Sequence, residues 1–261
     1  MTPAQMNREL LKIKNHGELT IYTVVTGSYV WYIPMFIYAM RKAYSNQKLH
    51  IIADTDDKEV LSLGGVLRVP MIRSEDSGHR AACTRFLFDD DVLTGSDYVL
   101  ITDIDMMFHK EEMSIIDQHM LDLRKNDLVC YSNCTTNGDR CPGVHFVTKD
   151  WWKITEDARE DEAHKLSELE TIPWDYDEQM LRRIIISSGL RTPPDGQNLW
   201  AFHGVHIGEY RHKLQQKNRD SWKSNKHAKE LVADPKFMEI AEWCHSKAPH
   251  LLIKECLEAM K

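Results

Sequence analysis

In the first half of the chain, short apolar runs alternate with segments whose apolar residues recur at helical spacing. Each run is rich in β-branched residues and only a few residues long, which predicts a strand. The predicted strands cover residues 19–26, 49–53, 66–72 and 98–103. The helices predicted between them cover residues 33–44 and 79–93. Strand followed by helix, repeated, predicts an α/β fold with a mixed sheet and helices on both faces.

The second half continues the alternation and then becomes helical. Helices are expected over residues 114–124 and 177–188, and strands over 128–131, 143–148 and 199–203. Asp234 before Pro235 is a helix start, and a second amphipathic helix follows Pro249. We therefore predict one α/β domain over residues 1–210 and a helical C-terminal extension over 211–261, packing on that domain or on a partner.

Composition excludes several functional classes. At 261 residues, with 42% hydrophobic and 28% charged residues, the chain can bury a substantial core. Its net charge of −7 argues against nucleic-acid binding, which needs a basic footprint. No segment approaches a membrane span and the N-terminus has no apolar export signal, so we expect a cytoplasmic protein with reduced cysteines. The basic stretch 211–229 is either a solvated helix face or a peripheral contact with phosphate or an anionic membrane.

Two aspartates follow the apolar strand in the segment YVLITDIDMMF, residues 98–108. In an extended chain residues i and i+2 point to the same side, so Asp103 and Asp105 aim together and Ile104 faces the core. Two carboxylates this close repel each other unless a cation lies between them. Oxygen ligands suit Mg²⁺ or Mn²⁺, and an ion held by few protein ligands keeps positions open for phosphates. The alternative is a chance match, because Asp-x-Asp is a short pattern.

Four further segments carry polar or small residues in a recognisable order around this pair. The aspartate pair ends the segment HRAACTRFLFDDDVLTGSDYVLITDID (79–105). The four others are YTVVTGS (22–28), CPGVHFVTKDWW (141–152), WDYDEQML (174–181) and LWAFHGVHIG (199–208). Over residues 19–211 the chain thereby resembles the GT-A glycosyltransferases, whose fold is Rossmann-like, and its layout is most similar to retaining families 8 and 6. The last segment departs from the family 8 pattern, because the Lys-Pro-Trp that follows there is absent.

The resemblance implies a metal-dependent transfer from a nucleotide-sugar, with UDP as the favoured nucleotide. Asp103 would contact the donor ribose, the metal or both, and Asp105 would ligate the metal. His203 is the expected third ligand and His206 its competitor; either can instead be a structural histidine. Arg85 would add a cation beside the diphosphate, unless it forms a surface ion pair with Asp89.

The remaining expected donor contacts are one glycine of a resembling segment and residues at or after the ends of the first two predicted strands. Gly143 would lie close to the donor sugar, and Thr26 and Tyr29 would contact the base, although aromatic residues after a first strand are often core residues. Asp54, at the end of the second predicted strand, is placed to meet base or ribose. A helix N-cap before Asp57 explains Asp54 almost as well.

The acidic segment supplies the expected catalytic and acceptor residues. Asp177 and Glu178 are candidates to stabilise the oxocarbenium-like centre, and the resemblance favours retention with Glu178 facing the anomeric carbon. Charge at a helix N-terminus accounts for either of them equally well. Trp151, Trp152 and Trp174, with Asp175, are candidates for an acceptor platform, and core packing explains at least one of the tryptophans.

We therefore predict a glycosyltransferase, moving a hexose or deoxyhexose from a nucleotide diphosphate to a glycan, glycolipid or glycoprotein. Two alternatives stay open. A phosphatase-like hydrolase would use Asp103 as its nucleophile. A non-catalytic carbohydrate-binding or interaction module would keep the fold without the chemistry.

Overall fold

The computed structural model describes residues 17–69, 77–132, 140–141, 144–192, 203–208 and 226–260. The chain forms two compact units whose segments alternate along the sequence. Unit 1 comprises Met1–Ile21, Cys83–Ile101 and Glu112–Ala201; unit 2 comprises Tyr22–Ala82, Thr102–Glu111 and Phe202–Lys261. Gly143, and the basic stretch up to residue 225, lie outside the described residues.

Strand β1 (Leu19–Thr26) is buried along its whole length and runs through both units. In unit 1 the strand order is β1, β4 (Tyr98–Ile101), β7 (His145–Thr148) and β6 (Cys130–Ser132); in unit 2 it is β3 (Val66–Arg68), β2 (Lys48–Asp54) and β1. Strands β2 and β3 are parallel, whereas β7 is antiparallel to both β4 and β6. The sheet is therefore mixed, as predicted.

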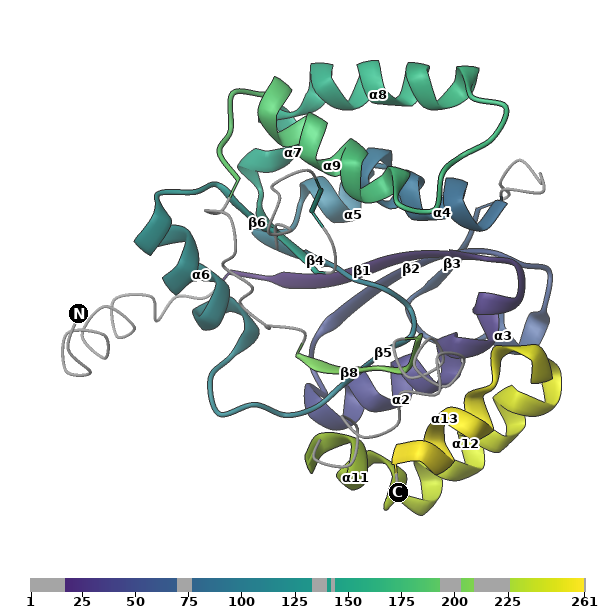
Figure 1. Cartoon of the computed structure of the whole chain (residues 1–261). Helices are drawn as coiled ribbons and strands as arrows, with labels where there is room; N and C mark the ends of the chain where they lie inside the picture. Colours follow the sequence, from purple (N-terminus) through teal and green to yellow (C-terminus); the bar gives the residue numbers. More distant parts are fainter. Residues whose placement is uncertain are drawn as a thin grey trace. The chain divides into compact units, whose positions relative to one another are not determined.

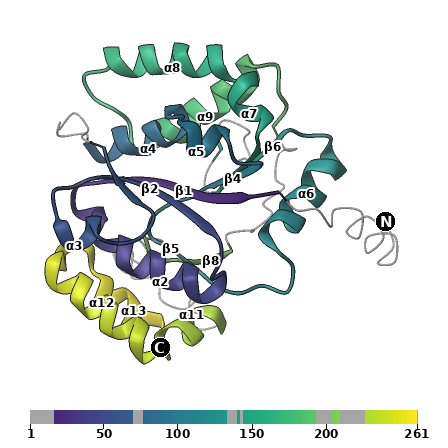
Figure 2. The ribbon, with the colours of Figure 1, turned by 180° about the vertical axis from the view of Figure 1, so that it is seen from behind.

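Helices cover both faces of the unit 1 strands. Successive residues of a strand point to opposite faces, and two successive residues of β7 contact different helices. The ring of Phe146 stacks on His119 of α6 (Ile115–Asn126), with 4.5 Å between ring centroids. The next side chain back, His145, meets Trp151 of α7 (Asp150–Ile154) at 4.7 Å. Figures 1 and 2 show α6 and α7 on opposite sides of these strands.

The outer helices of unit 1 are α8 (Glu156–Glu168) and α9 (Tyr176–Ser187), which pack on each other. Glu162 of α8 is 2% exposed, and Arg183 of α9 donates to both of its carboxylate oxygens at 2.7–3.1 Å. Because a buried charge is tolerated only when it is paired, this bond fixes the two helices against each other.

Unit 2 is built around α2 (Ile33–Ala43), which follows the 3-10 helix η1 (Gly27–Tyr32). One side of α2 packs on β5 (Met106–Phe108), where the rings of Phe36 and Phe108 meet edge to face. Strand β5 pairs with β8 (Gly204–His206) in a separate two-stranded sheet.

The C-terminal helices α11 (Lys226–Val232), α12 (Pro235–Lys247) and α13 (Ile253–Met260) also belong to unit 2. Helix α12 packs on α2, and α13 packs on α12 (Figure 1, yellow). Asp234 caps α12 by accepting from the backbone N–H of Lys236 and Phe237, and it also bonds Tyr38 and Lys42 of α2. The C-terminal helices thus pack on their own chain, while the domain boundary expected at residue 210 stays a prediction.

The predicted fold class, a mixed α/β sheet with helices on both faces, is confirmed. Several boundaries differ. The helix expected over 79–93 is α4 (Ser77–Leu87) followed by α5 (Asp91–Thr94), because Asp90 accepts from the N–H groups of Val92 and Leu93 and starts a new helix. The strand expected over 66–72 is described only as Val66–Arg68. Within the described residues, no helix has both the length and the apolar character needed to cross a bilayer.

Candidate metal centre

The aspartate pair lies just beyond the carboxyl end of β4. Thr102 still donates to the carbonyl of Tyr22 at 3.0 Å, and the chain then turns before β5 begins at Met106. Within the turn Ile104 is 5% exposed, as is Asp105, while Asp103 is partly exposed. The apolar side chain is therefore held in the core, and Asp103 keeps access to solvent. From the sequence we expected Ile104 in the core and both aspartates on one side of an extended strand, whereas residues 104–105 form a turn and Asp105 is as buried as Ile104.

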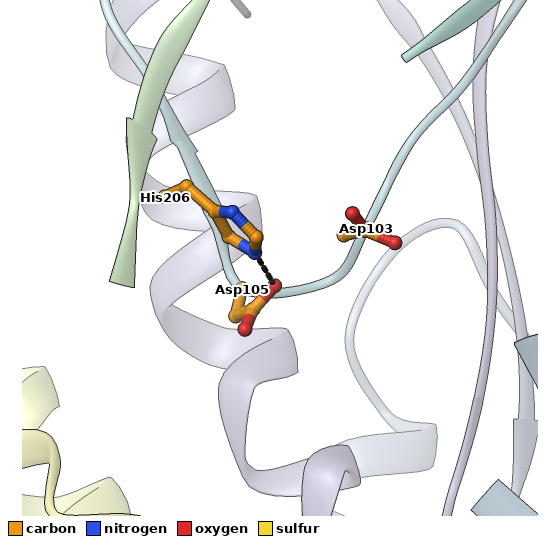
Figure 3. Close-up of side chains that lie close together, drawn as sticks. All are labelled: Asp103, Asp105 and His206. Atoms are coloured by element: carbon orange, nitrogen blue, oxygen red, sulfur yellow. Dashed lines mark hydrogen bonds and ion pairs between the residues drawn. The ribbon is translucent and has the colours of Figure 1, made fainter. Parts of the chain in front are cut away.

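His206 joins the two aspartates from β8. The antiparallel register pairs His206 with Met106, the residue directly after Asp105. The Nε2 atom of His206 is 3.0 Å from Oδ1 of Asp105, and because an ionised carboxylate only accepts, Nε2 donates. Figure 3 shows the imidazole directed at Asp105, with Asp103 beyond it. One potential ligand atom from each of the three residues lies within 4.8 Å of the other two.

The backbone after β8 lies close to the aspartate turn. The N–H of Ile207 donates to the carbonyl of Asp105 at 2.9 Å, so the chain after β8 continues alongside the aspartate turn. A Cβ placed on Gly208 would come 2.2 Å from Oδ2 of Asp105 and 3.2 Å from Nε2 of His206. Only glycine fits there without displacing a member of the cluster.

These donors fit a divalent metal ion. Two carboxylates and one imidazole are oxygen and nitrogen ligands of the kind that suits Mn²⁺, and the carboxylates alone suit Mg²⁺. The set is also incomplete for a six-coordinate ion, which leaves positions for ligand oxygens. The residues present therefore match a metal centre that is open to substrate.

His203, the expected third ligand, points elsewhere in this structure. Its side chain is buried, and Nδ1 is 2.8 Å from Oε2 of Glu111. Its backbone has φ = +54°, a left-handed conformation that histidine adopts more often than most residues. The structure groups His206 rather than His203 with Asp103 and Asp105, and the identity of the third ligand stays a prediction.

The expected base and ribose contacts lie in unit 2, at the ends of β1 and β2 and in η1. Thr26 is buried at the end of β1, and Tyr29 lies in η1, partly exposed, with its ring 5.6 Å from that of Tyr32. Asp54 ends β2 and is partly exposed. The cap of the following helix, α3 (Lys58–Leu61), is Asp57, which accepts from two backbone N–H groups. The capping explanation for Asp54 therefore does not apply.

Arg85 and Asp177 form a buried ion pair in unit 1. Nη2 of Arg85 donates to Oδ2 of Asp177 at 2.8 Å, and both side chains are at most 10% exposed. The ion pair considered from the sequence, Arg85 with Asp89, is absent from the described contacts, and Asp89 instead accepts from Arg159 at 2.7 Å. A buried carboxylate paired in this way is held in a fixed position.

Glu178 and Asp175 share a different cation. Nη1 of Arg140 lies 3.4 Å from Oε2 of Glu178 and 3.5 Å from Oδ2 of Asp175, and its guanidinium lies over the ring of Trp174. Trp174 is 68% exposed. Sequence reasoning missed Arg140, which directly precedes the segment 141–152 and carried no recognisable pattern.

The other two predicted acceptor tryptophans lie in the core. Trp151 is completely buried against His145, and Trp152 is 4% exposed beneath the guanidinium of Arg159. Of the three tryptophans, Trp174 is the one whose ring a sugar can reach in this structure.

Comparison with known proteins finds similarity only at the level of structure. No protein-family model and no curated protein sequence matches the chain. The glycosyltransferase GlyE of Streptococcus pneumoniae TIGR4 aligns over 78% of this chain with 15% identity and a TM-score of 0.46, and its apo form aligns with 14% identity and a TM-score of 0.45. The chain spans 50% of the GlyE chain. The galactosyltransferase LgtC, solved with donor and acceptor sugar analogues, aligns over 63% of this chain and 70% of its own, with 11% identity and a TM-score of 0.40.

Proposed function

We propose that the protein is a metal-dependent glycosyltransferase that uses a nucleotide diphosphate sugar as donor. The observation that carries the proposal is the cluster of Asp103, Asp105 and His206 just beyond the carboxyl end of a buried strand. Ligands of α/β sheets bind at this end of the strands, and this set of donors suits a cation that a diphosphate can share. The order of the other sequence segments around the pair supports glycosyl transfer.

In this proposal Asp103, Asp105 and His206 hold the ion. When bound, Mn²⁺ or Mg²⁺ supplies positive charge that stabilises a departing diphosphate. In this structure Asp105 is 5% exposed and accepts the hydrogen bond from His206, which fixes the orientation of its carboxylate; to ligate an ion through Nε2, His206 would have to give up this hydrogen bond. Asp103 is partly exposed and is the carboxylate placed to reach a ribose hydroxyl. UDP is the nucleotide that we propose, with Thr26, Tyr29 and Asp54 as its protein contacts.

The surroundings of Asp177 and Glu178 differ, and we propose different roles for the two carboxylates. Asp177 is already paired with a buried arginine, Arg85, so we assign it to holding that cation in place. Glu178 is 20% exposed and within reach of solvent, so it is the carboxylate that we propose for stabilising the anomeric centre of a retained sugar. Trp174 and Asp175 are the proposed acceptor contacts, because an exposed aromatic ring can stack on a sugar.

Nucleotide binding tests the proposal. Thermal denaturation is measured with UDP, GDP and dTDP, each with and without Mn²⁺, for the wild type and for Asp105→Asn. A ligand at ~100 times its Kd adds about 2.7 kcal/mol to the native state, which is a clear shift in Tm. We expect a shift with UDP that requires Mn²⁺ and disappears in Asp105→Asn. Asp56→Asn is the matched control, because Asp56 is 68% exposed and forms an ion pair with Arg68, which is itself at the surface.

A second measurement separates transfer from hydrolysis. A phosphatase that used Asp103 as nucleophile would cleave simple phosphate esters and form an aspartyl-phosphate, whereas a glycosyltransferase would release UDP from a UDP-sugar. Phosphate-ester turnover without a nucleotide-dependent shift would reject the proposal in favour of the hydrolase. Absence of both would favour the non-catalytic module.

A further inference from the structure

The proposed metal centre depends on a very short pair of strands. Strands β5 and β8 each have three residues, paired Met106 to His206, Met107 to Val205 and Phe108 to Gly204. Two-stranded pairings of this size are at best marginally stable alone. A slip of one residue would turn His206 to the opposite face, away from Asp105. Something beyond the three residue pairs must hold this register.

The end of the ladder away from the aspartates is tied by His203 and Glu111. The N–H of His109 donates to the carbonyl of His203 at 3.0 Å, one step beyond the pair of Phe108 and Gly204. The imidazole of His203 is 1% exposed, and its Nδ1 lies 2.8 Å from Oε2 of Glu111. Because Glu111 follows β5 and His203 precedes β8, this bond crosses between the two strands where they part.

The hydrogen bond between His203 and Glu111 fixes the orientation of the His203 ring. An ionised carboxylate only accepts, so Nδ1 of His203 carries the proton and the ring is fixed in one tautomer. A charge-assisted hydrogen bond in a buried place is stronger than a neutral one at the surface. The left-handed backbone of His203, φ = +54°, is strained for a residue with a side chain, so the surrounding contacts must hold it.

Two neighbours enclose the bond. The other oxygen of Glu111 lies 3.7 Å from Nε2 of His109, whose ring stacks on His227 of α11 with 3.5 Å between centroids. On the β8 side, a Cβ on Gly204 would come 2.2 Å from the carbonyl of Met107, so the two strands are already in close contact. The strand end therefore has little freedom to move once Glu111 and His203 are joined.

We propose that Glu111 and His203 are positioning residues: their hydrogen bond holds β8 in register and thereby places His206 against Asp105. The inference rests on the proposed metal centre for its function, but the placement of His206 is testable without a metal. Their effect is carried by the three residues of β8.

The test compares Glu111→Ala with Glu112→Ala, the exposed neighbour, using two measurements. The ring ¹⁵N resonances of His206 report its hydrogen bond to Asp105 without any metal, and titration with Mn²⁺ alone gives the affinity. Outer-shell partners of metal ligands change affinity by about 10–100-fold. We expect Glu111→Ala to shift the His206 resonance and weaken Mn²⁺ binding by that factor, and Glu112→Ala to change neither.

Other outcomes have distinct meanings. Unchanged His206 resonances and affinity in Glu111→Ala would overturn the proposal. Tighter Mn²⁺ binding would also overturn it, because Glu111 would then compete with the metal for His203. A wild type that binds no Mn²⁺, combined with a shifted His206 resonance in the variant, would reject the proposed function and keep the positioning role.

A second variant covers the case in which Glu111→Ala does not fold. His203→Asn keeps a residue that tolerates the left-handed backbone but is too short to replace the imidazole. We expect the same shift of the His206 resonance and the same loss of affinity. Loss of affinity with an unshifted His206 resonance would mean that His203 itself ligates the metal, which overturns the proposal.

Discussion

At the scale of single residues, Gly208 is the position whose change should affect the metal centre most selectively. A Cβ there would come 2.2 Å from Oδ2 of Asp105 and 3.2 Å from Nε2 of His206. Gly208→Ala therefore has to displace one of the two, and overpacking of this kind costs about 1–3 kcal/mol. We expect Mn²⁺ affinity to fall at least ~10-fold, as for other changes that misplace a ligand, measured by titration calorimetry.

Gly64→Ala is the control for this change, because a Cβ on Gly64 meets no atom within 4 Å and the residue has no left-handed backbone. It should leave Mn²⁺ binding unaltered and change the free energy of unfolding by less than about 1 kcal/mol. Wild-type Mn²⁺ affinity in Gly208→Ala would show that the metal, if bound, does not use Asp105 in the orientation seen here.

The aspartate pair follows from a local pattern, whereas for its histidine partner sequence reasoning favoured His203 first, with His206 as the competitor. Asp103 and Asp105 were proposed from a local pattern alone, two carboxylates directly after an apolar strand, although the chain turns there instead of staying extended. The choice between His203 and His206 depends on the register of β5 with β8 and on one left-handed residue. Both are set by tertiary contacts such as Glu111, which no local pattern encodes.

At the scale of elements, the N-terminus of α12 is fixed on α2 by a single carboxylate. Asp234 accepts from Lys42, from the Tyr38 hydroxyl and from the first N–H groups of α12. The hydrogen bond from Lys42 is the largest cause that lowers the pKa of Asp234 to about 2, and it outweighs burial, which alone would raise it. The start of α12 was predicted from Asp234-Pro235, but its partner on α2 was not, because the two lie far apart in sequence.

A lowered pKa gives this interaction a definite pH dependence. Its stabilisation is complete above the ordinary aspartate pKa and is lost as the pH falls from about 5 through the folded value near 2. The lowered pKa corresponds to about 2–3 kcal/mol at most, and roughly half of that remains after allowing for screening at the exposed Lys42. Asp234→Asn keeps a capping side chain but not the charge, so it should lower the free energy of unfolding by about 1–2 kcal/mol at pH 7.

Urea denaturation at pH 7, 5 and 3 checks this expectation. The difference between wild type and Asp234→Asn should shrink as the pH falls, because the wild-type carboxylate then begins to bind a proton. Glu239→Gln removes an exposed charge from the same helix, where it pairs with Lys236, and should have little effect at any pH. A difference that stays constant with pH would assign the effect to capping geometry instead of charge.

Long strands were predictable from the sequence, and the short strand β5 was not. The long apolar strands β1 and β2 carry enough β-branched residues to be recognised singly, and both were predicted close to their observed bounds. Strand β5 has only three residues, too few for any periodicity, and was not predicted. It exists because Phe108 packs on Phe36 and because β8 supplies its hydrogen-bonding partner.

At the scale of the whole molecule, the two units cannot be separated along the chain. Each is assembled from three segments that alternate in sequence, and β1 contributes Leu19–Ile21 to one and the remainder of its buried length to the other. A unit that lacks a continuous segment of its own has to form together with its neighbour. We therefore expect one cooperative unfolding transition, with calorimetric and van't Hoff enthalpies equal.

Hydrogen exchange in denaturant tests this expectation directly, because one helix from each unit can be followed. Helix α9 belongs to unit 1 and α12 to unit 2. Peptides from the two helices should lose protection at the same urea concentration. Saturating the site proposed in unit 2 with Mn²⁺ and UDP should raise that concentration for both helices, since a ligand that binds only the native state stabilises every element that unfolds with it. Protection of α12 alone would show that the units open independently, despite the strand that they share.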